Sequence, residues 1–255
     1  MIRRFNRYEL KYIVTFNCAR RIIADLRGFT KPDAHGGEAG YRVVSLYYDS
    51  PGLDFFWAKV DGLKFRRKVR IRVYPRERLD AVRDAMVEIK QRVNRTVQKR
   101  RLQLPLEQAE RLCTGALDVA IADAVDGQVA SEVVYLVRAM HLAPACITDY
   151  HRMAFVGGLY DAGLRVTFDF NVGCRAHALK VNQESNNHLL LPPDLCIMEV
   201  KVNEAVPDWM TSLLARYNCQ LRRVSKYCAG LALARRIQVI PLVVGPVFDE
   251  GANHG

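Results

Sequence analysis

Lys64-Phe65-Arg66-Arg67-Lys68-Val69-Arg70-Ile71-Arg72-Val73 is the stretch of sequence that decides the fold. In a β-strand, side chains alternate between two faces, and this stretch then places five cations on one face: Lys64, Arg66, Lys68, Arg70 and Arg72. The other face is apolar, with Arg67 as its one break. Like charges in a row repel one another and require anions nearby. The row therefore either faces water and salt or binds a polyanion.

The same alternation recurs in five further segments, and it predicts an antiparallel sheet with one polar, mainly cationic face. These segments are 7–14, 87–90, 150–155, 164–171 and 197–202. A single strand of this kind is typical of a solvated sheet, but six of them favour one shared surface. If the sheet closes into a barrel with these faces inward, the interior is a charged tunnel and the apolar faces pack against outer helices.

Composition indicates an anionic partner. The chain has 255 residues, with 38 Lys and Arg against 27 Asp and Glu, a net charge of +11 and a pI near 9.5. Such a balance is typical of proteins that bind phosphates, nucleic acid or a membrane surface. We expect one domain over residues 1–240 and a disordered tail over 241–255.

The cysteines and the N-terminus predict the cellular compartment. The seven cysteines include no CxxC pair and lie mostly in apolar runs, so we expect buried, reduced thiols. The N-terminus shows no apolar signal region, and no run of about 18 apolar residues occurs anywhere. The sequence therefore predicts a cytoplasmic protein without a membrane segment.

Periodicity and turn residues predict the order of elements. Eight strands are expected at 5–14, 41–49, 64–73, 85–93, 95–104, 146–156, 163–172 and 195–203, with a ninth candidate at 174–181. Helices are expected at 19–26 (with Asn17 as its cap), 53–60, within 105–143, from 207 to 217 and at 224–236. The inward face of strand 95–104 stays open at this point.

Seven motifs, in order and spacing, resemble the polyphosphate polymerase domain of the vacuolar transporter chaperone (VTC) proteins. They are Arg7-Tyr8-Glu9-Leu10-Lys11-Tyr12, Ser45-Leu46-Tyr47-Tyr48-Asp49-Ser50, Lys68-Val69-Arg70-Ile71-Arg72-Val73-Tyr74, Glu88-Ile89-Lys90, Tyr150-His151-Arg152, Met198-Glu199-Val200-Lys201 and Ser225-Lys226-Tyr227. The resemblance covers about residues 5 to 230. It places the chain in the triphosphate tunnel metalloenzyme (CYTH-like) superfamily. That superfamily implies an α+β fold, an eight-stranded antiparallel β-barrel with helices packed outside.

The resemblance also implies roles for individual residues. Catalysis is implied for Arg70, Arg72, Lys90 and Arg152, and substrate binding for Lys11, Lys99, Arg165, Lys201 and Lys226, to which we add Lys68 of the cationic row. Glu199 is implied as the ligand of Mn²⁺ or Mg²⁺. Arg100 is an alternative to Lys99, and Lys201 could instead pair with Glu199. Superfamily triphosphatases begin with Glu-x-Glu-x-Lys, whereas this chain has Arg7 at the first Glu position, which disfavours a two-metal hydrolase.

The function that the resemblance implies is a metal-dependent polyphosphate polymerase, which transfers the γ-phosphate of ATP onto inorganic polyphosphate or orthophosphate. Arginine and lysine suit this chemistry because positioning and charge neutralisation supply most of the catalysis in phosphoryl transfer. Two alternatives stay open: a hydrolase of triphosphate or polyphosphate in the same tunnel, and a non-catalytic module that binds polyphosphate or nucleic acid.

Partners and counter-charges complete the expectations. A tunnel lined by facing side chains does not admit a duplex, and the chain has no aromatic ladder for single strands, so no nucleic acid is expected. A membrane partner that exports the product stays open. Glu9, Glu88 and Asp169 are expected to act as counter-charges inside the tunnel, with metal ligation as the alternative.

Overall fold

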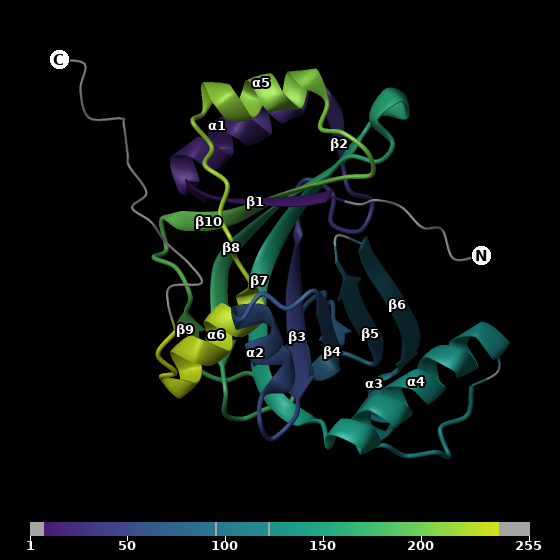
Figure 1. Ribbon diagram of the computed structural model, residues 1–255. Helices are drawn as coiled ribbons and strands as arrows, with labels where there is room; N and C mark the ends of the chain where they lie inside the picture. Colours follow the sequence, from purple (N-terminus) through teal and green to yellow (C-terminus); the bar gives the residue numbers. More distant parts are fainter. Residues whose placement is uncertain (1–7, 95, 122, 240–255) are drawn as a thin grey trace.

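The centre of the protein is one antiparallel β-sheet, in a computed structural model that describes residues 8–94, 96–121 and 123–239. Eight strands follow one another in the order β1-β10-β8-β7-β3-β4-β5-β6, while β2 pairs with β7 and β9 with β8 (Figure 1). Their bounds are β1 Tyr8–Thr15, β2 Thr30–Pro32, β3 Tyr41–Asp49, β4 Phe65–Val73, β5 Asp84–Val93, β6 Thr96–Pro105, β7 Ala143–Gly157, β8 Arg165–Arg175, β9 His188–Leu189 and β10 Leu195–Val202.

The sheet is strongly curved but open, so the prediction of a closed eight-stranded barrel is wrong. The sheet has ten strands, and in the described part of the chain no backbone ladder joins the edge strands β1 and β6. Its twist still brings the two ends towards each other, since Lys90 Nζ on β5 lies 2.8 Å from Glu9 Oε2 on β1. Side chains, rather than backbone hydrogen bonds, therefore connect the two ends.

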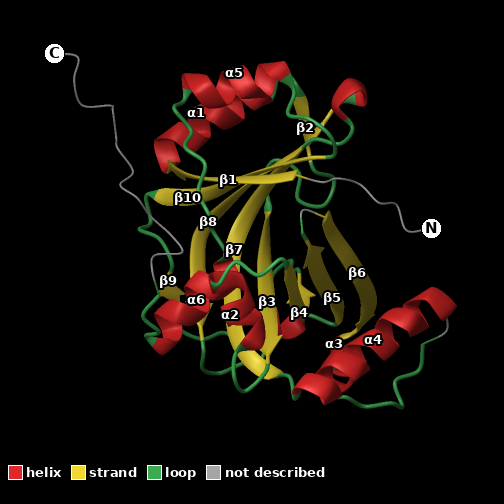
Figure 2. Ribbon diagram, in the orientation of Figure 1, coloured by secondary structure: helices red, strands yellow, loops and turns green. Residues whose placement is uncertain are grey.

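The apolar strand faces pack against helices outside the curve, as the alternation predicted (Figure 2). On β4, Val69, Ile71 and Val73 are fully buried in a core shared with α3 and α4. At the other end of the sheet, α1 and α5 cover the apolar side of β1, β8 and β10. The helices are α1 Phe16–Leu26, α2 Asp54–Val60, α3 Leu106–Leu112, α4 Ala124–Met140, α5 Asp208–Arg216 and α6 Lys226–Arg235, with 3₁₀ turns at Leu79–Ala81 and Leu159–Asp161.

Helices α2 and α6 pack on the opposite side of the sheet. Phe56 of α2 and Tyr227 of α6 share a small core with Tyr47 of β3. Tyr47 stands directly opposite Arg70 in the β3–β4 ladder, so its side chain lies on the cationic side of β4. Asp49, at the end of β3, accepts hydrogen bonds from two backbone amides of α2, each at 2.9 Å, and from the Tyr227 hydroxyl. This carboxylate therefore fixes both helices against the sheet.

Several predicted boundaries differ from the structure. The ninth candidate strand is wrong because β8 ends at Arg175, whose buried guanidinium donates to carbonyl oxygens of the following loop. The two helical segments expected within 105–143 are α3 and α4, whereas α1 begins at Phe16 with Thr15 rather than Asn17 as its cap, because Thr15 Oγ1 accepts from Cys18 N at 3.1 Å. Residues 5–7 of the first predicted strand and the predicted tail 241–255 lie outside the described residues.

Two further expectations can be compared with the structure. No disulfide is formed among the cysteines, all of which lie in the described ranges, and five of the seven are buried. Searched over the same ranges, no helix combines the length and apolar character needed to span a membrane.

Candidate functional site

The ten cations predicted to contact phosphate all lie on one side of the curved sheet, which we call the inner face. Directly opposite residues in a ladder share a face, and this places Lys68, Lys90 and Lys99 in one row across β4, β5 and β6. Arg165 and Lys201 are likewise opposite each other on β8 and β10. The remaining members of the set are Lys11, Arg70, Arg72, Arg152 and Lys226. Their contact with phosphate stays a prediction.

The structure answers the open question about strand β6. Lys99 points inward, where its ammonium pairs with Glu88 of β5. Arg100 points outward, and its Nη2 lies 2.6 Å from Glu132 Oε1 on α4. Lys99 rather than Arg100 therefore belongs to the inner face.

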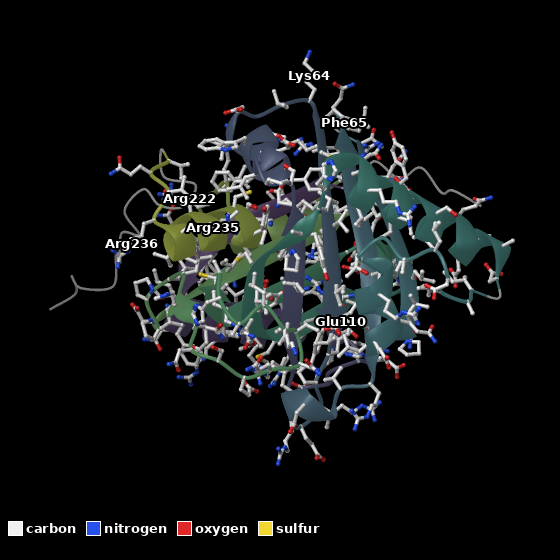
Figure 3. The ribbon with its side chains drawn as sticks, turned by 90° about the horizontal axis from the view of Figure 1, so that it is seen from below. Lys64, Phe65, Glu110, Arg222, Arg235 and Arg236 are labelled. Carbon is white, nitrogen blue, oxygen red and sulfur yellow. The ribbon has the colours of Figure 1, made fainter. Side chains whose placement is uncertain are left out.

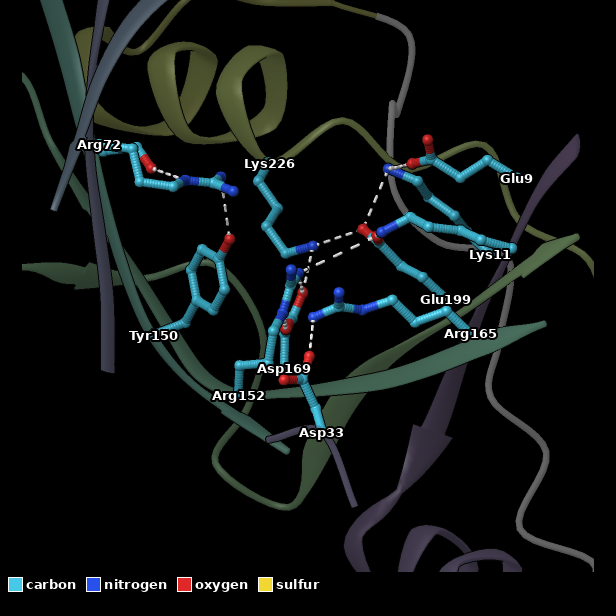
Figure 4. Close-up of polar contacts among 12 residues, drawn as sticks. Glu9, Lys11, Asp33, Arg72, Tyr150, Arg152, Arg165, Asp169, Glu199 and Lys226 are labelled. Atoms are coloured by element: carbon cyan, nitrogen blue, oxygen red, sulfur yellow. Dashed lines mark hydrogen bonds and ion pairs between the residues drawn. The ribbon is translucent and has the colours of Figure 1, made fainter. Parts of the chain in front are cut away.

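Glu199 is the centre of the site (Figure 4). Its Oε1 lies 2.7 Å from Lys226 Nζ and 3.2 Å from Lys11 Nζ, and its Oε2 lies 2.7 Å from Lys201 Nζ. Burial would raise the pKa of Glu199, but Lys11, Lys201 and Lys226 outweigh it and hold that pKa well below its usual value. The carboxylate is therefore ionised at neutral pH, and the predicted Lys201–Glu199 pair does form.

Asp169 on β8 is the second buried carboxylate of this cluster. Arg152 binds it with two nitrogens, at 2.6 and 2.8 Å, and Lys226 Nζ lies 2.5 Å from its Oδ2. The Lys226 ammonium thus bridges Asp169 and Glu199. Lys226 reaches this position because it begins α6, directly after Ser225, whose hydroxyl caps the helix.

Glu9 and Glu88 act as counter-charges in the same way. Glu9 lies 2.8 Å from Lys90 Nζ and 3.1 Å from Lys11 Nζ. Glu88 is 1% exposed and accepts from Arg70 Nε at 2.7 Å while also pairing with Lys99. These contacts favour the counter-charge interpretation over metal ligation.

Two of the ten cations bind hydroxyl groups instead of carboxylates. Arg72 donates to Ser45 Oγ at 2.9 Å and to the Tyr150 hydroxyl at 3.3 Å, and Lys68 donates to Ser225 Oγ at 2.8 Å. Because hydroxyls carry no charge, both side chains keep their full positive charge. Among the described residues, the other eight cations pair with five carboxylates: Glu9, Asp33, Glu88, Asp169 and Glu199. The inner face therefore carries a surplus of positive charge.

The surplus charge changes the titration of individual groups. Desolvation and the neighbouring arginines Arg70 and Arg72 lower the pKa of Lys99 to about 8, although Glu88 opposes them. Burial would raise the pKa of Tyr47, yet Arg70, Arg72 and Lys68 lower it to about 8. Both shifts have the sign that a cationic environment produces.

Sequence reasoning did not identify the hydroxyl partners of these cations or the carboxylate of Asp33. Ser45 and Tyr150 hold Arg72, and Asp33, from the loop after β2, pairs with Arg165. Tyr47, on the same side of the sheet, stacks on Tyr227 with ring centres 4.8 Å apart. The one available signal was alternation in 45–48, which puts Ser45 and Tyr47 on the same face.

The carboxylates fit a divalent metal only in part. Within the described residues, no three His, Cys, Asp or Glu side chains are grouped to form a metal cage. Mg²⁺ in phosphate-transfer sites is commonly held by one or two carboxylates together with substrate phosphates. Glu199 is buried and ionised on the inner face. It provides one such carboxylate ligand if Lys11, Lys201 and Lys226 contact a bound phosphate chain in place of Glu199.

Comparison with known proteins identifies the family. No curated protein matches the chain. Among solved structures, the chain is similar to "putative adenylate cyclase" proteins of Bacillus halodurans (12% identity, TM-score 0.48, 86% of this chain and 95% of that one) and Vibrio parahaemolyticus (10%, 0.43, 89% and 97%). These likenesses are too weak to establish an activity. The VTC domain model, by contrast, matches residues 6–235, and the chain therefore belongs to the VTC domain family.

Proposed function

We propose that this protein is a metal-dependent polyphosphate polymerase, which transfers the γ-phosphate of ATP onto a growing inorganic polyphosphate chain. The observation that carries the proposal is the surplus of positive charge on the inner face, where eight of the ten cations share five carboxylates and Arg72 and Lys68 contact hydroxyls. A chain of linked phosphates supplies the missing negative charge. Membership in the VTC domain family supports a phosphate substrate.

Arg72 and Lys68 are the cations that can bind phosphate without first breaking an ion pair. Neither must leave a carboxylate first, because their partners are the hydroxyls of Ser45, Tyr150 and Ser225. The planar guanidinium of Arg72 can engage two phosphate oxygens at once. Cations such as Lys11 and Lys226 would exchange their carboxylate contacts for phosphate contacts as the chain binds.

The transfer itself needs little from the protein beyond alignment and charge neutralisation. An ionised terminal oxygen of the acceptor chain attacks the γ-phosphorus in line. The new oxygen–phosphorus bond forms as the bond between the γ-phosphorus and the bridging oxygen breaks, and ADP leaves with that electron pair. A Mn²⁺ or Mg²⁺ ion on Glu199, when bound, would supply further neutralisation of the phosphate oxygens.

Incubation with ATP and Mn²⁺, followed by a phosphate-chain gel and ADP quantification, tests the proposal. We expect phosphate chains together with ADP. Orthophosphate without chains would identify a hydrolase instead, and binding without turnover would identify a non-catalytic module. Arg72→Ala should lower the rate by about a hundredfold, as loss of a transition-state charge contact does. Arg67→Gln, which alters a cation on the opposite face of β4, should leave the rate unchanged.

A further inference from the structure

The beginning of β4 holds cations that the proposed function does not yet use. Arg66 stands directly opposite Arg92 in the β4–β5 ladder, one inner-face position beyond the Lys68–Lys90 pair. Figure 3 shows Lys64 and Phe65, just before Arg66, at the outer edge of the molecule. Arg66 and Arg92 therefore lie where the inner face meets the surface.

Helix α2 adds a third cation to this position. Helix α2, which carries Lys59, packs against β4, and desolvation, Arg66 and Lys68 together lower the pKa of Lys59 to about 8. Desolvation and Arg92 likewise lower the pKa of Arg66. We call Lys59, Arg66 and Arg92 the outer cation group.

The outer cation group, like Lys68 and Arg72, has no carboxylate counter-charge within the described residues. Across residues 8–94, 96–121 and 123–239, no carboxylate forms an ion pair with any of its three members. Like charges directly opposite each other in a ladder destabilise a sheet. Two inner-face positions along the same ladder, beyond Lys68 and Lys90, the opposite pair is Arg70 and Glu88, which attract each other. The outer cation group therefore lacks the internal compensation that Glu88 gives Arg70, and an external anion would supply it.

Distance separates this group from the centre of the site. Arg66 and Arg72 are six residues apart on one strand, which corresponds to roughly 20 Å of strand length. A triphosphate bound at Arg70 and Arg72 is too short to reach Arg66 as well. A longer linear chain can follow the inner-face side chains of β4 from Arg72 through Lys68 to Arg66.

We propose that the outer cation group is a further anion site, which binds the distal phosphates of a linear chain longer than triphosphate. The inference rests on the proposed function, because it requires phosphate at Arg70 and Arg72. The proposed site gives the protein a preference for long phosphate chains. Lys59, Arg66 and Arg92, which are not among the ten cations of the central site, produce this preference.

Calorimetric titration with tripolyphosphate and with a long linear polyphosphate of defined length tests the site. The wild-type protein should bind the long chain more tightly, and Arg66→Gln should weaken long-chain binding about tenfold, the loss of one charge-assisted contact, while sparing tripolyphosphate. Arg67→Gln is the matched control. It removes the same charge from the adjacent residue, whose guanidinium lies over the outer Phe65 ring, 4.6 Å from its centre, and it should change neither affinity.

The outcomes separate this inference from the proposed function. If wild-type protein binds both ligands equally, or if Arg66→Gln and Arg67→Gln behave alike, the outer site is refuted while phosphate binding stands. If wild-type protein binds neither ligand, both proposals fail. Lys59→Gln, on a different element, provides a second test with the same expected loss, and circular dichroism confirms that each variant is folded.

Discussion

At the scale of single residues, Arg70 and Arg72 show how two similar side chains acquire different roles. Both lie on the inner face of β4, two residues apart. Arg70 is tied to Glu88, with Nη2 2.5 Å from Oε2, and also donates to the Tyr47 hydroxyl at 2.9 Å. Within the described part of the chain, Arg72 has only hydroxyl partners. Arg70 is therefore both a structural ion and a candidate phosphate ligand, whereas Arg72 is free to bind an anion.

This difference predicts unequal costs of removing the two arginines. Arg70→Ala leaves the buried Glu88 with Lys99 alone, and breaking a buried ion pair costs about 3 to 5 kcal/mol. Arg72→Ala removes hydrogen bonds to hydroxyls and should cost about 1 to 2 kcal/mol. Urea unfolding measures both values, and tripolyphosphate binding should be weakened in both variants. Equal loss of stability would contradict the distinction.

At the scale of elements, the end of β3 determines where α2 and α6 lie. The Asp49 carboxylate accepts hydrogen bonds from first-turn backbone amides of α2 and from the hydroxyl of Tyr227 on α6. The amides of a first helical turn have no hydrogen-bond partner within the helix. Because Lys226 precedes Tyr227, the same carboxylate helps to place the Lys226 ammonium between Asp169 and Glu199. A structural contact on one strand thus positions a charged group in the site.

Replacement of Asp49 should consequently affect both stability and binding. Asp49→Ala leaves the amide donors of Ser50, Phe55 and Phe56 unsatisfied and should reduce the free energy of unfolding by about 3 kcal/mol. Asp49→Asn keeps one carbonyl acceptor and should cost less. Urea unfolding gives the stabilities, and calorimetry should show weaker tripolyphosphate binding for the Ala variant. Unchanged binding in Asp49→Ala would show that α6 is held in place without Asp49.

At the scale of the whole molecule, folding gathers charges from strands at both ends of the sheet. Glu9 of β1 and Lys90 of β5 lie far apart in the sequence, and they meet because the sheet curves. The carboxylates satisfy the cations of the centre, and the hydroxyl-bound cations remain positive. Affinity for a polyanion is therefore a property of the assembled inner face.

Affinity for tripolyphosphate should fall as pH rises through about 8. Lys99 has a pKa of about 8, lowered first by desolvation, so it is protonated and attractive below that pH and neutral above it. Loss of one charge-assisted contact corresponds to about a tenfold change in affinity. Lys99→Arg is the control, because a guanidinium keeps its charge and the titration of the ligand is common to both proteins. Calorimetry at several pH values should show the wild-type affinity falling below that of the variant, and parallel profiles would contradict the assignment.

Much of the site could be predicted before the fold was known. Alternation along 64–73 and the other strands identified the cations that share a face, because the two-residue period of a strand is a local property of the backbone. The same pattern predicted which apolar residues form the core beneath the outer helices. It could not choose between Lys99 and Arg100, since that choice depends on how β6 pairs with β5 and on Glu132 of α4.

Only the tertiary structure shows that the sheet is open, that Glu199 pairs with three lysines, and that Lys226 lies between Asp169 and Glu199. Each depends on contacts between residues distant in sequence, such as Lys226 with Asp169 and Glu199, or Glu9 with Lys90. Local patterns specify the direction in which a side chain points. Curvature and register specify which groups it contacts there. Among the described residues of this protein, they leave Arg72, Lys68 and the outer cation group without carboxylate partners.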